Sequence, residues 1–568
     1  MSDLIIDKHE WVFENSEEEE QILGDTVFEI CTKEQQMEFI AWILDMSEQE
    51  VNQGTDFLIG HNASFKILWN LLLNLDTYTV VLEDHYVDRV YRDSYYFYYS
   101  SKHFSYSRFC KRLCLFAGRL EHNFFDCTCE ELENCFMGSI VIRPVPDRSV
   151  GRTLLNPCYF LPREKACQIR LAKYNVTVYG KKLHVWAFPF GMQDGETTSC
   201  AEITILNLLD YYSQSYPEYH YLLPSEISGL AETNSYERRM PTTGLSYELI
   251  SKIFCDVGFY PRLYSAQKMT KVKFRNILHY YIESGIPVAL GLRVGRENRH
   301  SIISIGHIVP DKDKLGKQLT CVYDSANKNT IWTCDTADTV DTYCIMDDNN
   351  VPYKLSVCTE DISEKNIPVL KLNKCEIEYM MVPLYKRMIL EAADAYDICL
   401  SILSSSQFGI KKILEKCDVS VKLKEIDPYI DQAGSKDEPF VVRLFMASSR
   451  TFRRYRDEQF SNGNYEVRDL YNMTIFPKFV WCCELTTRAF YQKDQVLGEI
   501  IIDATSAADA KTNSFIVIHY PNAVCYRRPE DFVETGDAEF KYVKNWCPFT
   551  AFQDNLKNCS RNRRGESL

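Results

Sequence analysis

The chain has 568 residues, of which 45% are hydrophobic and 13% aromatic, and its formal net charge is −15 at pH 7. The composition excludes an intrinsically disordered chain, and the length predicts roughly two to four domains. The acidic balance argues against nucleic acid and against an anionic membrane as partners.

The sequence carries no secretory signal and no stretch long enough to cross a bilayer. Residues 1–20 are acidic, and the longest apolar run, at 65–75, is about half the length of a membrane-spanning helix. We therefore expect a cytoplasmic protein whose 22 cysteines are reduced thiols. The loose cluster of Cys127, Cys129 and Cys135 has no histidine to complete a zinc pattern, so we expect neither a metal nor a cofactor.

Residues 1–165 are predicted to form an N-terminal α+β domain. A helical pattern covers 34–46, and β-branched and aromatic runs predict a strand at 77–83 and a strand with its turn at 138–155. The tyrosine-rich stretch between these strands is typical of an aromatic core or a domain interface.

The segment MQDGETTSCAEITILNLLDYYS, residues 192–213, places a cysteine where a nucleophile would be useful. Apolar residues recur from Ala201 to Tyr212 at the spacing of one helical face, and residues 197–199 are capping residues, so Cys200 falls in the first turn. The free N–H groups and the dipole at that end favour an anion, here the reactive thiolate. Gln193, upstream in the loop, could donate to an oxyanion. The competing interpretation is a buried core cysteine.

The elements after this helix supply a base and a carboxylate in order. Two further helices are predicted at 244–258 and 273–285, followed by a buried strand at 288–294. The apolar strand HSIISIGHIV then opens with His300, and the strand LTCVYD ends with Asp324. A thiol nucleophile needs a base within hydrogen-bonding reach and a carboxylate or amide that fixes the tautomer of the base.

This order resembles the papain-like cysteine peptidases, nearest to the branch that includes the double-glycine leader peptidases, over about residues 190–330. The resemblance implies a Cys200, His300 and Asp324 triad, with Gln193 and the Cys200 N–H holding the oxyanion. Two features depart from the family pattern. Gln193 stands seven residues before the cysteine where the family usually has six, and Glu202 in the first helical turn would disfavour a thiolate by charge repulsion.

Two residues stay in reserve for these roles. His307 is an alternative base, but it is seven residues from His300, so on an unbroken strand the two side chains point to opposite faces. A bulge at Gly306 would remove that argument. We expect His307 to be a structural histidine. Asn327 is the alternative to Asp324, because strand register cannot be fixed from the sequence.

The sequence as a whole predicts an α+β protein. We expect a papain-like cysteine peptidase core at 166–375, built from a helical layer and an antiparallel sheet, between the N-terminal α+β domain and a C-terminal β-rich mixed domain at 376–568. Within the C-terminal domain, the basic stretch 448–460 is expected to be a solvated face.

The leading functional expectation is a bacterial, intracellular cysteine peptidase that hydrolyses protein or peptide substrates. Its flanking domains, or a regulatory protein partner, would restrict its activity. Two alternatives use the same fold. One is a thiol acyltransferase or transglutaminase, which differs only in its acceptor, and the other is a catalytically inactive binding module.

Overall fold

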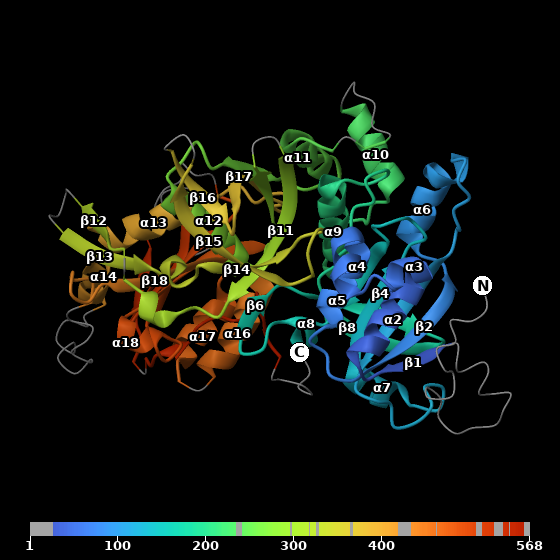
Figure 1. Cartoon of the computed structure of the whole chain (residues 1–568). Helices are drawn as coiled ribbons and strands as arrows, with labels where there is room; N and C mark the ends of the chain where they lie inside the picture. Colours follow the sequence, from blue (N-terminus) through green and yellow to red (C-terminus); the bar gives the residue numbers. More distant parts are fainter. Residues whose placement is uncertain are drawn as a thin grey trace.

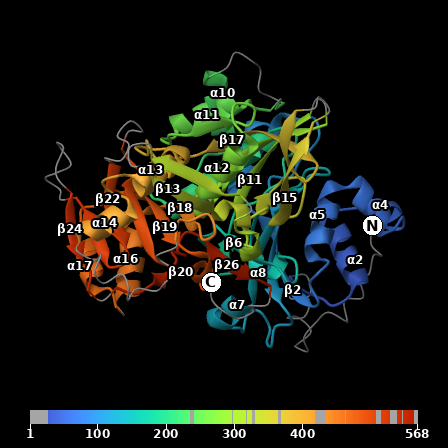
Figure 2. The same ribbon diagram turned by 90° about the vertical axis from the view of Figure 1, so that its left-hand side faces the viewer.

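A computed structural model describes residues 26–234, 241–242, 244–295, 298–316, 318–324, 329–363, 367–417, 433–461, 463–506, 514–527, 538–544 and 546–561. The chain is a mixed α+β protein built on three large sheets in which nearly all neighbouring strands are antiparallel. The N-terminal unit, in blue, and the C-terminal unit, in orange and red, lie at opposite ends of a central green and yellow barrel (Figures 1 and 2).

The N-terminal sheet has the strand order β1-β2-β3-β4-β5. Its strands are β1 (Val27–Ile30), β2 (Tyr78–Tyr86), β3 (Cys110–Ala117), β4 (Phe136–Ile142) and β5 (Val150–Leu155). The helices of this unit are α2 (Lys33–Ile43), α3 (Glu48–Val51), α4 (Thr55–His61), α5 (Ala63–Leu72), α6 (Arg89–Phe97), η2 (Tyr99–Ser101), α7 (Cys129–Cys135) and α8 (Pro157–Phe160). The hairpin β7 (Ala172–Val178) and β8 (Lys181–Ala187) packs on β4 and β5. Strand β4 is buried along its whole length, because side chains cover both of its faces.

The tyrosine-rich segment forms the aromatic core that the sequence predicts. Tyr91, Tyr98 and Tyr99 are buried with Cys110, and Tyr106 packs against them. The rings of Tyr99 and Tyr106 lie with their centroids 4.8 Å apart. The cluster therefore stabilises the fold, while Tyr96, Phe97 and Phe104 of the same segment are exposed.

The central sheet closes on itself as a six-stranded barrel, since β10 pairs with β11 as well as with β17. The barrel strands are β10 (Val288–Val294), β17 (Cys375–Val382), β16 (Pro368–Leu372), β15 (Lys354–Ile362), β14 (Thr342–Met346) and β11 (Asn298–Ile308). Three more strands extend it, β9 (Arg262–Ser265), β6 (Ala166–Ile169) and β26 (Lys557–Ser560). The helices associated with it are α9 (Cys200–Ser215), α10 (Pro224–Thr233), α11 (Tyr247–Asp256) and α12 (Lys271–Glu283).

The C-terminal sheet has eight strands, and β13 and β18 form its parallel pair. Its strands are β12 (Thr320–Asp324), β13 (Asn329–Asp335), β18 (Phe440–Ser448), β19 (Phe479–Thr486), β21 (Gly498–Asp503), β22 (Phe515–Tyr520), β23 (Ala523–Tyr526) and β24 (Glu539–Tyr542), and the short strands β20 (Gln495–Val496) and β25 (Phe549–Thr550) pair separately. The helical elements of this end are η3 (Lys312–Lys314), η4 (Thr336–Thr339), α13 (Ala392–Ser404), α14 (Ile410–Lys416), α16 (Ser449–Phe460), α17 (Tyr465–Met473) and α18 (Arg488–Tyr491). The basic stretch 448–460 is not a uniformly solvated face, because Arg456 of α16 is 0% exposed.

The sheets do not follow the three predicted segments. Strands β12 and β13 lie inside 166–375, yet they pair into the C-terminal sheet through β18. In the other direction, β26 returns from the end of the chain to pair with β6 beside the barrel. Local apolar patterns predict that a strand exists, but the choice of sheet depends on contacts between distant segments.

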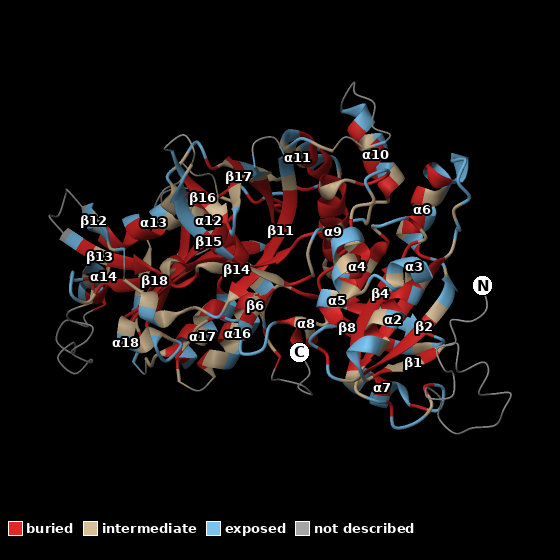
Figure 3. Ribbon diagram, in the orientation of Figure 1, coloured by how far each residue is buried: buried red, intermediate tan, exposed pale blue. Residues whose placement is uncertain are grey.

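The buried residues concentrate in the strands of all three sheets and along α9 and α12, while the outer helices show exposed faces (Figure 3). Helix α9 lies between the barrel strand β11 and the N-terminal unit (Figure 1). Arg152 of β5 binds Asp210 of α9 through Nε at 2.7 Å and Nη2 at 3.2 Å, which ties the N-terminal sheet to this helix. No helix among the described residues is long and apolar enough to cross a membrane.

Candidate active site

Cys200 is the first residue of α9, where the sequence places it. Ser199 caps the helix, and its hydroxyl accepts from the Ala201 N–H at 3.3 Å. Glu202 completes a capping box by accepting from the Ser199 N–H at 3.0 Å, and its other oxygen accepts from the Thr242 hydroxyl at 2.8 Å. The carboxylate of Glu202 is therefore committed to the helix cap. Helix geometry leaves the Cys200 N–H without a partner inside the helix.

The loop before Cys200 is organised around a buried carboxylate. Asp194 accepts from the N–H groups of Thr197 at 2.8 Å and Thr198 at 2.9 Å, and Arg143 lies 3.7 Å from its other oxygen. Burial alone would raise the pKa of Asp194, but the Arg143 charge and these hydrogen bonds lower it below its ordinary value. The ionised carboxylate fixes the loop that delivers Cys200 to its position.

A hydroxyl pair fastens the cysteine helix to the strand that carries the histidine. The Thr204 hydroxyl donates to the Cys200 carbonyl at 2.8 Å and lies 3.0 Å from the hydroxyl of Ser301. Ser301 directly follows His300 on β11. The first turn of α9 and the start of β11 are thus held side by side.

His300 forms a hydrogen bond with Asp347. The His300 Nε2 atom lies 2.8 Å from Asp347 Oδ1. Asp347 directly follows β14, the barrel strand that pairs with β11, so the two residues meet at one end of neighbouring strands. The Asn349 N–H at 3.1 Å and the Asn350 side-chain amide at 2.6 Å also donate to the Asp347 carboxylate. These donors fix its orientation toward the histidine.

His300 interacts with both Cys200 and Asp347. Burial alone would lower the pKa of His300, but hydrogen bonds to Asp347 and to Cys200, together with the Asp347 and Asp348 charges, raise it from 6.5 to about 10. Asp347 contacts Nε2, and the Asn349 side-chain amide nitrogen lies 3.4 Å from the same atom. The raised pKa keeps the imidazole beside Asp347 protonated at neutral pH.

A second carboxylate lies beside this pair. Asp348 Oδ1 is 3.5 Å from His300 Nε2, and burial raises the pKa of Asp348 to about 6 despite the opposing His300 charge. The backbone N–H of Gln193 faces the Asp348 carboxylate and lowers that pKa slightly. His300, Asp347 and Asp348 are close enough to be considered as cation ligands. The hydrogen bond between His300 and Asp347, together with the interaction of His300 with Cys200, favours an acid–base role instead.

The structure brings Cys200 and His300 together but corrects the predicted carboxylate. Asp324 ends β12 in the C-terminal sheet, and β12 is not a neighbour of β11. Asp347 takes the expected place, because β12 and β13 pair into the C-terminal sheet and the next barrel strand after β11 is β14. Asn327 lies outside the described residues. The missed signal is TYCIMDD, a second apolar strand ending in aspartate.

The two remaining candidates lie in different surroundings. Gln193 is half-buried in the loop beside Asp348. His307 is 0% exposed and lies 2.9 Å from Glu283, so it serves a different cluster. The register of β11 against β14 shifts between Ser304 and Gly306, so strict alternation does not extend to His307. His307 still contacts Glu283, whereas His300 contacts Asp347, so the two histidines belong to different clusters.

The sequence matches no protein-family model, and no curated protein is similar to it. The interpretation of the site therefore depends on its own geometry.

Proposed function

We propose that this chain is a cysteine peptidase that hydrolyses peptide bonds through Cys200, His300 and Asp347. The observation that carries the proposal is the position of His300, which hydrogen-bonds to Asp347 through Nε2 at 2.8 Å and also interacts with the Cys200 thiol. A nucleophile, a base and a group that orients the base are the three parts that thiol catalysis requires.

The same groups account for each chemical step. The Cys200 thiolate attacks the peptide carbonyl, and the Cys200 N–H, assisted by the Gln193 amide, stabilises the oxyanion. His300 gives its proton to the leaving amine as the C–N bond breaks. The neutral imidazole then takes a proton from water while the oxygen attacks the thioester, which releases the carboxylic acid and regenerates the thiolate beside the protonated imidazole. Asp347 keeps the imidazole in one orientation throughout.

The arrangement of elements supports a papain-like core. The helix that begins at Cys200 packs against an antiparallel barrel. His300 lies on one barrel strand, and Asp347 directly follows the neighbouring strand. The raised pKa of His300 supports catalysis over a purely structural role, because such shifts concentrate at functional sites.

Substrate profiling tests the proposal. Peptide libraries would be incubated with the wild type, Cys200→Ala and Asp347→Asn, and new peptide termini identified by mass spectrometry. Asp324→Asn is the matched control, since it makes the same change at the carboxylate that the structure separates from His300. We expect cleavage by the wild type and Asp324→Asn, none by Cys200→Ala, and a loss on the order of 10²–10⁴-fold in Asp347→Asn.

A second arm identifies the acceptor. A fluorescent primary amine added with the peptides would be incorporated in place of water if the chain is an acyltransferase. Amine incorporation that depends on Cys200, with no new termini, would replace the peptidase proposal by the transferase. The absence of both reactions, together with ordinary Cys200 reactivity toward electrophiles, would favour the inactive binding module.

A further inference from the structure

Three buried side chains converge on one point away from Cys200. His279 and Glu283 are four residues apart on α12, so they share a helical face, and His307 reaches them from β11. The His307 Nε2 atom lies 2.9 Å from Glu283 Oε1, and His279 Nε2 lies 3.9 Å from the same oxygen. Their ligand atoms all lie within 4.8 Å of one another.

The hydrogen bond on the far side of His307 determines what its Nε2 atom can do. Nδ1 lies 2.7 Å from the Ile308 carbonyl, which can only accept, so Nδ1 carries a hydrogen. The other ring nitrogen, Nε2, therefore faces the Glu283 carboxylate, and it is the atom available to bind a metal ion. A backbone carbonyl on the opposite nitrogen is also the usual partner of a metal-binding histidine.

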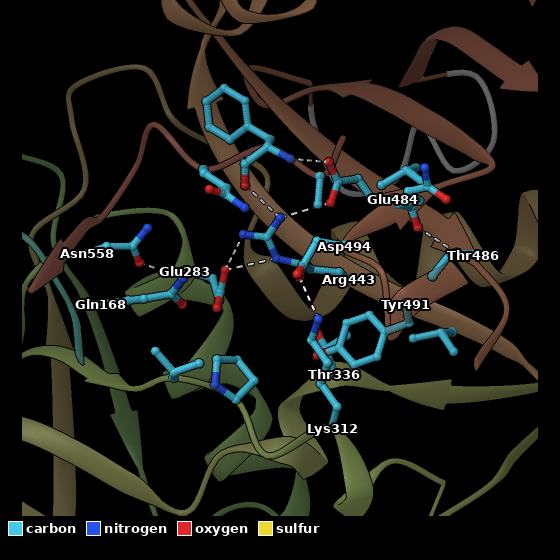
Figure 4. A pocket seen from close by; sticks show the side chains of 18 of the residues that line it. Gln168, Glu283, Lys312, Thr336, Arg443, Glu484, Thr486, Tyr491, Asp494 and Asn558 are labelled. Carbon is cyan, nitrogen blue, oxygen red and sulfur yellow. Dashed lines mark hydrogen bonds and ion pairs between the residues drawn. The ribbon is translucent and has the colours of Figure 1, made fainter. Parts of the chain in front are cut away.

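The other oxygen of Glu283 is already occupied. Arg443 donates to Glu283 Oε2 from Nε at 3.0 Å and Nη2 at 2.7 Å, which leaves Oε1 for the histidines. Arg443 also binds Glu484, and Arg456 binds Glu484 and Glu499 (Figure 4 shows the Arg443 contacts). Two guanidinium groups face three carboxylates in this network, so one negative charge has no arginine to compensate it.

His279 adds an unsatisfied imidazole to the cluster. Its side chain is 1% exposed, and neither ring nitrogen has a hydrogen-bond partner among the described residues. An unpaired buried polar group costs free energy, so a ligand for it would be stabilising. His279 and Glu283 also line a cavity of about 320 Å³ between the barrel and the C-terminal sheet, with Arg443, Lys312 and Tyr491 around it (Figure 4).

We propose that His279, Glu283 and His307 bind one divalent first-row transition-metal ion, with a free coordination position facing the cavity. Two imidazoles and a carboxylate are ligands that Zn²⁺ and its neighbours in the series prefer. Bonds of about 2.05 Å in a tetrahedral site separate ligand atoms by roughly 3.3 Å. The observed separations of 2.9 and 3.9 Å lie on either side of that value, so small side-chain movements complete the site. This inference is independent of the peptidase proposal.

Cobalt binding to the full-length protein tests the site, because Co²⁺ reports its ligands by colour. The 22 cysteines of the chain could also bind metal, and sulfur ligands would add an intense charge-transfer band. Chelator-treated wild type titrated with Co²⁺ should take up one ion per chain and show d–d bands without the sulfur band. His279→Ala should lose this ion, and its fold should persist because His279 makes no hydrogen bond among the described residues.

His300→Ala is the control, since His300 belongs to the other histidine and aspartate cluster, and it should bind Co²⁺ like the wild type. Binding unchanged in His279→Ala, a sulfur charge-transfer band, or no stoichiometric binding by the wild type would each overturn the proposal. If His279→Ala does not fold, anomalous scattering from cobalt-soaked wild-type crystals must locate the ion at these three side chains.

Discussion

At the scale of single residues, the proposed mechanism depends on the charge of His300. A protonated imidazole beside a thiol stabilises the thiolate, and the raised pKa of His300 keeps the ring protonated across the neutral range. Many other thiols of the chain lie in the opposite environment. Burial raises the pKa of Cys167, Cys334 and Cys358 to about 12, which makes them poor nucleophiles at neutral pH.

The first prediction concerns Asp347. Asp347→Asn keeps the size of the side chain but removes the charge that raises the pKa of His300, so that pKa should fall toward 6.5. The rate of Cys200 alkylation by iodoacetamide between pH 6.5 and 10, followed by mass spectrometry, should therefore fall, because an uncharged imidazole no longer stabilises the thiolate. The exposed Cys255 provides the internal reference and should react alike in both proteins. An unchanged profile would show that Asp347 does not control His300.

The second prediction concerns stability. His300 has a higher pKa in the folded protein, about 10, than its ordinary 6.5, so its protonation stabilises the fold fully below pH 6.5. That contribution is lost as the pH rises from about 6.5 to about 10. Urea unfolding midpoints of the wild type and His300→Gln should therefore differ most near pH 6 and converge toward pH 10. A difference that grows with pH would contradict this assignment.

At the scale of elements, α11 lies against the barrel beside the site through one close approach. Tyr247, the first residue of α11, crosses the face of β10 at Gly291 and packs on Tyr379 of β17 with ring centroids 4.9 Å apart. Burial raises the pKa of Tyr247, and the Cys200 charge raises it further, which places the tyrosine near Cys200. A side chain at position 291 would occupy the space that the tyrosine ring takes.

The third prediction tests this contact. A Cβ at position 291 would overlap the Tyr247 ring, so Gly291→Ala should destabilise the protein by roughly 1–3 kcal/mol and slow Cys200 alkylation. Tyr247→Ala in the same chain should restore most of the stability, and the coupling can be measured in a double-mutant cycle of urea unfolding. Gly229→Ala on α10 is the control, because its Cβ would meet open space. Additive effects of the two substitutions would contradict the contact.

At the scale of the whole molecule, the barrel and the C-terminal sheet depend on each other. Glu283 of α12 binds Arg443 of β18, and the Ser284 hydroxyl accepts from the Met446 N–H at 2.8 Å. Strand β26 pairs with β6 beside the barrel, and the β12–β13 hairpin extends the C-terminal sheet. Each unit thus contains strands contributed by the other part of the chain.

The fourth prediction follows from this exchange. Residues 166–375 expressed alone should fail to unfold cooperatively, because the barrel loses β17, β13 loses β18, β6 loses β26 and Glu283 is left buried without Arg443. Residues 1–375 and 376–568 expressed together should copurify as one complex. Circular dichroism during heating and size-exclusion chromatography would measure both outcomes. A stable monomer of 166–375 with a sharp unfolding transition would contradict the prediction.

The sequence alone determined the features that depend on neighbouring residues. Helical periodicity and the capping residues before Cys200 placed it at the start of α9, since caps and amphipathic spacing are local properties. The apolar run after position 300 predicted β11 with His300 near its start. The tyrosine-rich stretch was predicted to form an aromatic core because many aromatic residues lie close together in the sequence, which is also a local property.

Only the tertiary structure decided which distant segments meet. The strand pattern pointed to Asp324, with Asn327 in reserve. Strand pairing instead puts Asp347, which directly follows β14, beside His300, and Asp324 in another sheet. The 448–460 stretch looked solvated, yet Arg456 is buried against Glu484 and Glu499, which lie about 30 to 40 residues further along the chain. His279, Glu283 and His307 converge only because α12 packs on β11. Which strands pair depends on the apolar surface that distant segments of the chain bury together. A local sequence pattern does not report that quantity.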